Sequence, residues 1–356
     1  MTHKTWFDDT DAALDEAAQR YLAERYPFAQ RQRLASAARR FDAAIWEGLA
    51  QMGWCSVANE AEQGGFGVRI SSVCLLSERA GQALLNEPWL SSGVLAPWLV
   101  GRHASAAQQQ AWLPSLLNGQ RRAACLLEPQ AMAVQGGTLT GRQSLVPDAD
   151  LAEQLFVAAE GALWQVDTAQ DGVQRRPLPL LDGRGAASVD LVDAQATRLD
   201  GTLPFTAGPA LQLAALATAC DAWGALRAVF DLTLNYLKTR RQFGVPLGSY
   251  QALQHRMVDF YIRVEESRAV LDQAIAALAA GADSATRDVH AAKALVCEHA
   301  LLGAQEAVQL HGGIGITEEY AASHYLRRVR VDEQLYGAGE QHFLAFAATA
   351  ATTATV

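Results

Sequence analysis

The spacing of apolar residues along the 356-residue chain changes twice. From about residue 9 to residue 117 apolar side chains recur every three or four positions, as in FDAAIWEGLAQMGW, where Phe41, Ile45, Leu49 and Met52 share one helical face. Turn sequences such as EQGGFG and NEPWLSSG separate these segments, and Asp42 is placed to cap the helix that follows it. The first third of the chain is therefore predicted to be helical.

The middle of the chain has a different pattern. Residues 121–206 contain short segments of alternating polarity, such as GGTLTGRQSLV and AASVDLVDA, separated by Gly, Pro and Asp, which predict a small β domain of antiparallel strands. Helical periodicity returns at residue 209 in the segments 211–240, 250–280, 284–310 and 318–330. Long helices joined by short loops favour a four-helix bundle.

These patterns predict a mainly α fold with a central β domain. The expected division is an N-terminal helical domain over residues 1–118, a central β domain over 119–206, a four-helix bundle over 207–346 and a flexible, low-complexity tail over 347–356.

Composition and charge exclude several classes of partner. The formal net charge is -9, from 38 acidic and 29 basic residues, which opposes binding to a nucleic-acid backbone. The five cysteines form no C-x-x-C pair, so neither a disulfide framework nor a metal site is expected, and the cytoplasm is the expected location. The first residues lack the pattern of an export signal and no stretch predicts a membrane span, so no membrane insertion is expected.

Three motifs lie in the C-terminal half: TRRQFGVPLGSYQALQHRMVD at 239–259, QLHGGIGITEEY at 309–320 and LRRVRVDEQLYGAGEQ at 326–341. Together they resemble the acyl-CoA dehydrogenase family, and FDAAIWEGLAQMGW, GGFG and SERAGQALLNEPWLSS are a weaker N-terminal echo. The resemblance covers nearly the whole chain and is faintest in the β domain. It implies an N-terminal helical domain, a small antiparallel β-barrel and a C-terminal four-helix bundle.

The family's reaction needs a base and a flavin. A carboxylate removes a proton from Cα of an acyl thioester while FAD accepts hydride from Cβ. The pyrophosphate of FAD is anionic, so a guanidinium and closely approachable backbone N–H groups suit it. The resemblance implies cofactor-binding roles for Arg240, Gln242, Phe243, Gln309, His311, Gly312, Gly313 and Gln341.

In that family these groups reach across a dimer interface to a flavin held mainly by the neighbouring subunit, so the resemblance implies an FAD shared with a partner. The alternative is that Arg240 is a plain surface arginine and that the glycines only end a helix.

The family's base is missing from this sequence. It usually lies in a Tyr-Glu-Gly-Thr turn, and here Gly337 takes the place of the glutamate. A minority of members place the base in the first bundle helix, where this chain has Ala214 or Ala215. Glu340, with Asp332 and Glu333 nearby, is the remaining candidate for a displaced base.

The β domain also departs from the family where the flavin ring is normally held. Residues 127–133 read LEPQAMA and residues 145–147 read LVP, without the hydroxyls and the indole of relatives. An unpaired polar ring edge costs about 1–3 kcal/mol for each missing partner, so the chain's own flavin site is expected to be inactive.

Other charged positions give no catalytic pattern. His255, His299 and His324 are expected in surface or core roles. Glu265, Glu266 and Arg268 are expected on a solvated face or at a subunit contact.

The resulting hypothesis is a subunit of a heteromeric α2β2 acyl-CoA dehydrogenase, inactive alone, that shares FAD with a catalytic acyl-CoA dehydrogenase subunit. By resemblance, the substrate is an acyl-CoA from lipid degradation, such as a steroid side chain or ring fragment, and the electron acceptor is an electron-transferring flavoprotein. Two alternatives stay open: a self-sufficient homo-oligomer with a displaced base, and a non-enzymatic scaffold with this fold.

Overall fold

The computed structural model describes residues 6–36, 41–128 and 132–353, and it confirms a mainly helical fold with a central β region. Contacts divide the chain into two compact units: unit 1 contains residues 1–31, 74–85 and 215–356, and unit 2 contains residues 32–73 and 86–214. The N-terminal helical region is thus shared between the two units. The predicted boundaries at residues 118 and 206 stay a prediction about folding domains.

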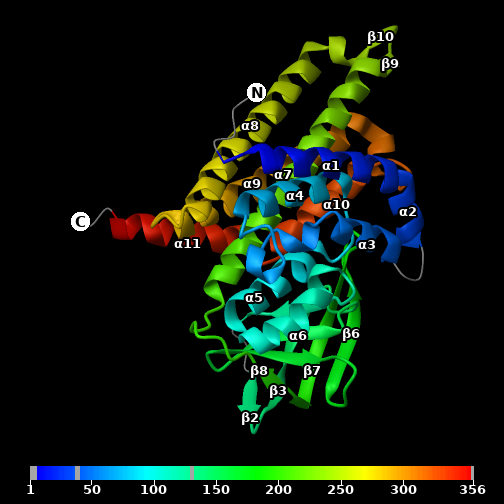
Figure 1. Ribbon diagram of the computed structural model, residues 1–356. Coiled ribbons are helices and arrows are strands. Elements are labelled where there is room, and N and C mark those ends of the chain that lie inside the picture. Colours follow the sequence, from blue (N-terminus) through cyan, green and yellow to red (C-terminus); the bar gives the residue numbers. More distant parts are fainter. Residues whose placement is uncertain (1–5, 37–40, 129–131, 354–356) are drawn as a thin grey trace. The chain divides into compact units, whose positions relative to one another are not determined.

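Unit 1 is helical and contains the four long helices that the periodicity predicts. They are α7 (Gly208–Thr239, which begins in unit 2), α8 (Gln251–Ala279), α9 (Ala285–His311) and α10 (Ala322–Gln334), shown in Figure 1. The N-terminal α1 (Asp9–Arg25), the first four residues of α2 (Phe28–Ser36) and most of α4 (Ile70–Ala83) complete this part of the chain. Helix α9 is central, because α8, α10 and α11 (Gly339–Thr353) all pack against it.

Helix α11 extends into the segment that the sequence analysis assigns to a flexible tail from residue 347, and the flexibility of that tail stays a prediction. The helix continues as far as Thr353. Its sequence there is rich in alanine, which has the highest intrinsic helix propensity, and low complexity does not prevent such a sequence from being helical.

Buried ion pairs join the helices of unit 1. The guanidinium of Arg328 on α10 donates to both carboxylate oxygens of Asp221 on α7, at 2.7 and 2.8 Å. Arg268 on α8 pairs with Glu78 on α4 and lies 2.8 Å from Asp272. The expectation of a solvated Arg268 is therefore wrong, because its charge is buried against two carboxylates from neighbouring turns and helices.

Unit 2 carries short helices and all the long strands. Its helices are α3 (Ala43–Gln51), α5 (Ala96–His103) and α6 (Ala106–Leu117), with single turns η1 (Trp54–Ser56) and η2 (Ala61–Gln63) and a π-helical segment η3 (Trp89–Leu95). The predicted cap is confirmed: the Asp42 side chain accepts a hydrogen bond from the amide of Ala44 at 2.9 Å. Ile45 and Leu49 are buried on the predicted face of α3.

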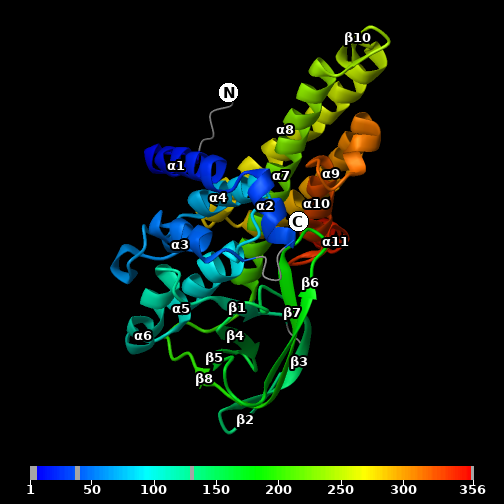
Figure 2. The same cartoon turned by 90° about the vertical axis from the view of Figure 1, so that its right-hand side faces the viewer.

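Two four-stranded sheets form the β region of unit 2 (Figure 2). One has the order β1 (Ala123–Leu126), β4 (Gln154–Ala159), β5 (Ala162–Asp167), β8 (Thr197–Arg198), and the other β2 (Ala133–Gln135), β3 (Thr138–Pro147), β7 (Gly185–Gln195), β6 (Val173–Pro179). The pairing of β1 with β4 is parallel, and the other pairings among the described residues are antiparallel, as predicted. Leu126, Leu139, Val146, Leu155 and Val189 lie in their shared core.

Among the described helices, α7 alone is long and apolar enough to cross a membrane by length and composition. Yet 83% of its apolar window is buried inside the protein, as in the core helix of a bundle.

Candidate functional site

A short hairpin follows α7 and carries the first group of predicted cofactor contacts. Strands β9 (Arg241–Gln242) and β10 (Val245–Pro246) pair antiparallel around a two-residue turn, Phe243-Gly244, with φ of 53° and 86°. Positive φ at both turn residues is typical of a type I′ turn, which glycine suits and phenylalanine does not. Figures 1 and 2 both show this hairpin at the far end of the paired helices α7 and α8.

The hairpin presents its side chains to solvent. Phe243 is 91% exposed, and Arg240 and Gln242 are exposed beside it. Phe243 is unfavourable in two ways, because its apolar ring is exposed to water and because its backbone is left-handed. The backbone conformation alone costs about 1 kcal/mol. Such a residue points to contact with something outside the chain.

The second group lies where α9 ends. The helix stops at His311, and the glycine turn η5 (Gly312–Ile316) follows, with Gly312 at a φ of 65°. A Cβ at Gly312 or at Gly313 would meet no atom within 4 Å. The backbone at these glycines is therefore open to close approach by a ligand.

Aromatic rings connect the end of α7, which carries the hairpin, with the end of α9, which carries the glycine turn. The ring of Tyr236, one turn before Arg240, lies 4.5 Å from the ring of His311, and the Tyr236 hydroxyl donates to the His311 carbonyl oxygen at 3.4 Å. Tyr320 packs on the same imidazole at 4.9 Å. Burial lowers the pKa of His311 below its ordinary value, so the ring is neutral near pH 7 and supports the turn from beneath.

These two groups fit the anionic half of FAD. The exposed guanidinium of Arg240 and the open backbone at Gly312 and Gly313 suit a pyrophosphate, because one gives a fixed fork of donors and the other allows close approach. The ring of Phe243 and the exposed amide of Gln309 are of the kind that contacts a nucleoside.

Gln341 does not join them. It lies on the first turn of α11, where its Oε1 accepts from the amide of Ala338 at 3.1 Å. The next residue, His342, contacts His290, which precedes Gln309 on α9 by nineteen residues, or about 28 Å of helix. Gln341 is therefore near the opposite end of α9 from the glycine turn.

The turn at Tyr336 and Gly337, where the resemblance places the family's base, is built around a histidine. Tyr336 and Gly337 both have positive φ, 57° and 99°, and a Cβ at Gly337 would lie only 2.6 Å from Nε2 of His342. That Nε2 is 3.0 Å from the carbonyl oxygen of Tyr336, and Nδ1 of His342 is 2.8 Å from Nδ1 of His290. The space that a side chain at position 337 would enter is thus occupied by an imidazole.

The protonation of this histidine pair follows from its contacts. A carbonyl oxygen only accepts, so His342 carries its hydrogen on Nε2 and His290 donates from Nδ1. Burial lowers the pKa of His290 and lowers that of His342 to about 4, so both rings are neutral near pH 7.

No carboxylate stands at either of the family's base positions. Ala214 and Ala215 are buried in α7. Asp332 is buried in the core within 3.8 Å of Arg328, so it faces away from solvent and is paired. Glu340 is exposed on the first turn of α11.

Most of the described positions in unit 2 where the resemblance places contacts to a flavin ring are apolar, with Glu128 as the exception. Leu127 and Val146 are buried, and Leu145 is exposed beside Pro147. Pro129, Gln130 and Ala131 lie outside the described residues. None of the described side chains at 127, 145, 146 or 147 offers a hydrogen bond to a polar ring edge.

Tyr236, Tyr320, His290 and His342 are the structurally important residues that the sequence analysis did not identify. Tyr236 precedes Arg240 by four positions, a spacing that places both on one helical face and that could have drawn attention to it. His290 and His342 are 52 residues apart, and no periodicity links them.

Other chemistry is not supported in the described ranges. Within residues 6–36, 41–128 and 132–353, no three His, Cys, Asp or Glu side chains gather in a group that could hold a metal ion. All five cysteines are buried, and burial raises the pKa of Cys55 to about 12, which keeps that thiol protonated and unreactive.

Comparison with known proteins adds to this geometry. The family described as "Acyl-CoA dehydrogenase, C-terminal domain" matches residues 206–350, and "Acyl-CoA dehydrogenase, N-terminal domain" matches residues 8–120. Acyl-CoA dehydrogenase IpdE2 of Mycolicibacterium smegmatis is 32% identical over 306 residues, covering 83% of this chain and 85% of that protein.

Two solved structures are close in fold. One is the Tcur3481-Tcur3483 steroid acyl-CoA dehydrogenase in a G363A variant, with a TM-score of 0.89 and 26% identity over 98% of this chain and 99% of that chain. The other is the ChsE4-ChsE5 complex of Mycobacterium tuberculosis, with a TM-score of 0.89 and 25% identity over 97% and 98% of the two chains.

Proposed function

Because the chain belongs to the acyl-CoA dehydrogenase family, we propose that it is the non-catalytic subunit of a heteromeric, FAD-dependent acyl-CoA dehydrogenase. The observation that carries the proposal is a contrast within unit 1. The exposed surface of Arg240, Phe243 and the glycine turn fits FAD, while the base position holds Gly337 with His342 packed over it.

In this proposal the partner subunit supplies the catalytic glutamate and most of the flavin site. FAD, when bound, accepts the hydride that leaves Cβ of the acyl-CoA. Arg240 pairs with its pyrophosphate, Gly312 and Gly313 let the backbone approach the same group, and Phe243 and Gln309 hold the adenosine. The assembly is an α2β2 heterotetramer with one FAD for each pair of chains.

The similar solved structures support a heteromer. Each of the two names a pair of components, and one of them is named as a steroid enzyme. We extend both features to this chain: a partner chain of the same family, and a bulky steroid-derived CoA thioester as substrate. An electron-transferring flavoprotein as acceptor follows from the family resemblance.

The test is to purify this chain alone and together with the acyl-CoA dehydrogenase encoded nearest to it, and to measure flavin absorbance per chain. A colourless lone chain and a yellow complex with about one FAD per two chains are expected. Arg240→Ala should lower the flavin content of the complex without dissociating it.

Two other outcomes would replace the proposal. A lone chain that holds its own FAD and reduces it with an acyl-CoA would favour the self-sufficient enzyme, with Glu340 as the residue to change first. A stoichiometric complex without flavin would favour the scaffold.

A further inference from the structure

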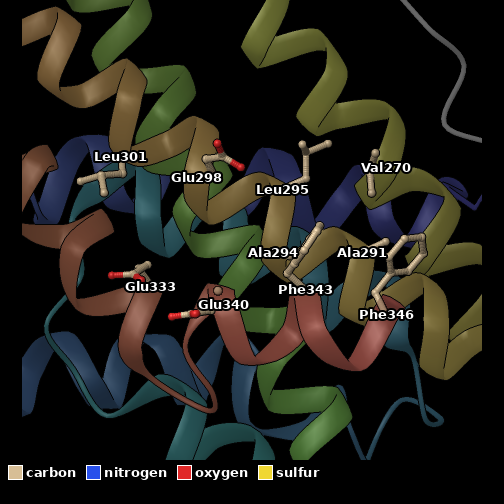
Figure 3. A pocket seen from close by; sticks show the side chains of 11 residues that line it. Val270, Ala291, Ala294, Leu295, Glu298, Leu301, Glu333, Glu340, Phe343 and Phe346 are labelled. Atoms are coloured by element: carbon tan, nitrogen blue, oxygen red, sulfur yellow. The ribbon is translucent and has the colours of Figure 1, made fainter. Parts of the chain in front are cut away.

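An apolar groove of about 620 Å³ lies on unit 1, lined by α8, α9, α10 and α11 (Figure 3). Leu295 of α9 and the rings of Phe343 and Phe346 on α11 form much of its lining. Phe343 is 60% exposed. A mostly apolar groove of this volume, open to solvent, is within the range of binding sites.

Three carboxylates border this apolar surface. Glu298 comes from α9, Glu333 from α10 and Glu340 from α11, and the lining contains no Lys, Arg or His. Glu333 pairs with Arg330 of its own helix at 3.4 Å, whereas Glu298 and Glu340 are exposed. Figure 3 shows the carboxylates toward one side of the groove, with Phe343 and Phe346 toward the other. The carboxylates therefore gather toward one side, where Leu301 also lies, and the two aromatic rings toward the other.

We propose that this groove docks a helix of the flavin-carrying partner subunit, with an apolar stripe flanked on one side by Arg or Lys. A helix of that kind matches both features of the groove, since apolar side chains enter it while the basic flank meets the carboxylates. The inference rests on the proposed function and specifies the surface through which the partner is recognised.

The charges argue against a second copy of this chain as the occupant. A two-fold contact pairs a surface with itself, so each copy would face a partner with the same three carboxylates and no lining base. The chain as a whole carries a net charge of -9, which adds to that repulsion. The two exposed carboxylates, Glu298 and Glu340, therefore favour a basic flank from a different chain.

The groove also borders the turn that lacks the family's base. Gly339, the first residue of α11 and two positions after Gly337, is part of its lining. A partner helix seated in the groove therefore contacts this chain beside the position where a catalytic glutamate is absent.

The first experiment reverses the charge of two of the carboxylates that border the groove, here called the rim. Glu298→Lys/Glu340→Lys alters exposed positions only, and Glu24→Lys/Glu62→Lys is a matched control with the same change in net charge at exposed sites elsewhere. The affinity for the co-purified partner is measured by surface plasmon resonance at 50 and 500 mM NaCl. We expect the rim variant to bind at least tenfold more weakly at low salt, with no change in the control.

Equal affinity of the rim variant and the wild type would overturn the inference and leave the proposed function standing. Failure of the wild-type chain to bind the partner at all would overturn both. The two failures are therefore distinguished by the wild-type measurement.

A second experiment identifies the occupant directly. A photocrosslinking benzoylphenylalanine replaces Phe343, and the same residue replaces Phe66 as an exposed aromatic control in unit 2. Crosslinks from position 343 to the partner chain are expected. Crosslinks between two copies of this chain would contradict the proposal. Loss of the crosslinks from position 343 when a small apolar ligand is added would contradict it as well.

Discussion

Arg240 and Phe243 are exposed on the hairpin at the end of α7, whereas two other arginines of unit 1 are buried with partners. Arg268 and Arg328 each contact carboxylates within the core. A buried arginine with such partners stabilises the packing of helices, because removal of either partner leaves an uncompensated charge. An exposed arginine has no such role and is free to bind an anionic ligand.

Replacing Arg240 tests that role. Arg240→Ala should weaken FAD binding to the complex by about tenfold or more, as expected for a charge-assisted hydrogen bond worth about 1.5–3 kcal/mol. Arg240→Lys should recover only part of the affinity, because an ammonium cannot form two parallel bonds. FAD titration of the stripped complex gives the affinities, and Arg20→Ala, an exposed arginine on α1, is the control. Equal FAD affinity of wild type and Arg240→Ala would remove this residue from the cofactor site.

Glu87, in contrast to the exposed Arg240, is a buried ionisable side chain. It lies between α4 and η3 with 3% of its surface exposed, and burial raises the pKa of its carboxyl to about 8. Because the folded-state pKa is above the ordinary value of 4.5, its favourable contribution is complete below pH 4.5 and is lost as the pH rises through 8.

We expect the free energy of unfolding of the wild type to fall by about 2–3 kcal/mol, relative to Glu87→Gln, between pH 6 and pH 9. Urea unfolding at the two pH values measures this difference. Glu62→Gln, an exposed carboxyl of unit 2, should follow the wild type at both. Parallel pH profiles for wild type and Glu87→Gln would mean that the buried carboxyl is ionised throughout.

At the scale of elements, two turns of unit 1 use positive φ for different purposes. In the hairpin, Phe243-Gly244 matches the twist of β9 and β10 and holds a ring outward. In the turn 336–339, the carbonyl of Tyr336 points to His342, and the histidine pair ties the start of α11 to α9. The second turn has no room for a side chain at position 337.

Restoring the family's glutamate should therefore fail. Gly337→Glu is expected to show no dehydrogenase activity in the lone chain, and Gly337→Ala should destabilise it by about 1 kcal/mol for the backbone and about 1–3 kcal/mol more for overpacking. Gly136→Ala isolates the backbone effect, because Gly136 also has a positive φ, 58°, but open space around it. Thermal and urea unfolding measure both.

A double-mutant cycle separates the cost of the contact between position 337 and His342 from the cost of the backbone conformation. In a His342→Ala background, Gly337→Ala should lose the overpacking part of its cost and resemble Gly136→Ala. An unchanged cost in that background would show that His342 is not what excludes a side chain from position 337.

At the scale of the whole molecule, the proposed function predicts which surfaces a partner covers. Hydrogen–deuterium exchange of the lone chain and of the complex should differ most in the hairpin 240–246 and in the glycine turn 312–316, because the shared FAD and the partner cover them. Helix α6, which carries no predicted contact, serves as the internal reference. Protection spread evenly over the chain, or absent from the hairpin, would contradict the proposed cofactor surface.

The sequence by itself determined the fold class, the helix positions and the family. Helical periodicity placed α7 to α10 within a few residues, because amphipathic spacing follows directly from the need to bury one face of each helix. The local motifs of the hairpin and glycine turn were also readable, since a turn depends mainly on its own residues. The glycine at position 337, where the resemblance places a glutamate, is likewise a property of the sequence.

The tertiary structure alone decided which distant side chains meet. Nothing local pairs His290 with His342, Arg268 with Glu78, or Tyr236 with His311, because each contact depends on how two helices pack. The same packing separates Gln341 from Gln309 by the length of α9, and it gathers Glu298, Glu333 and Glu340 from three helices around one apolar groove. Sequence order carries no record of these distances, which arise only when the helices are placed against one another.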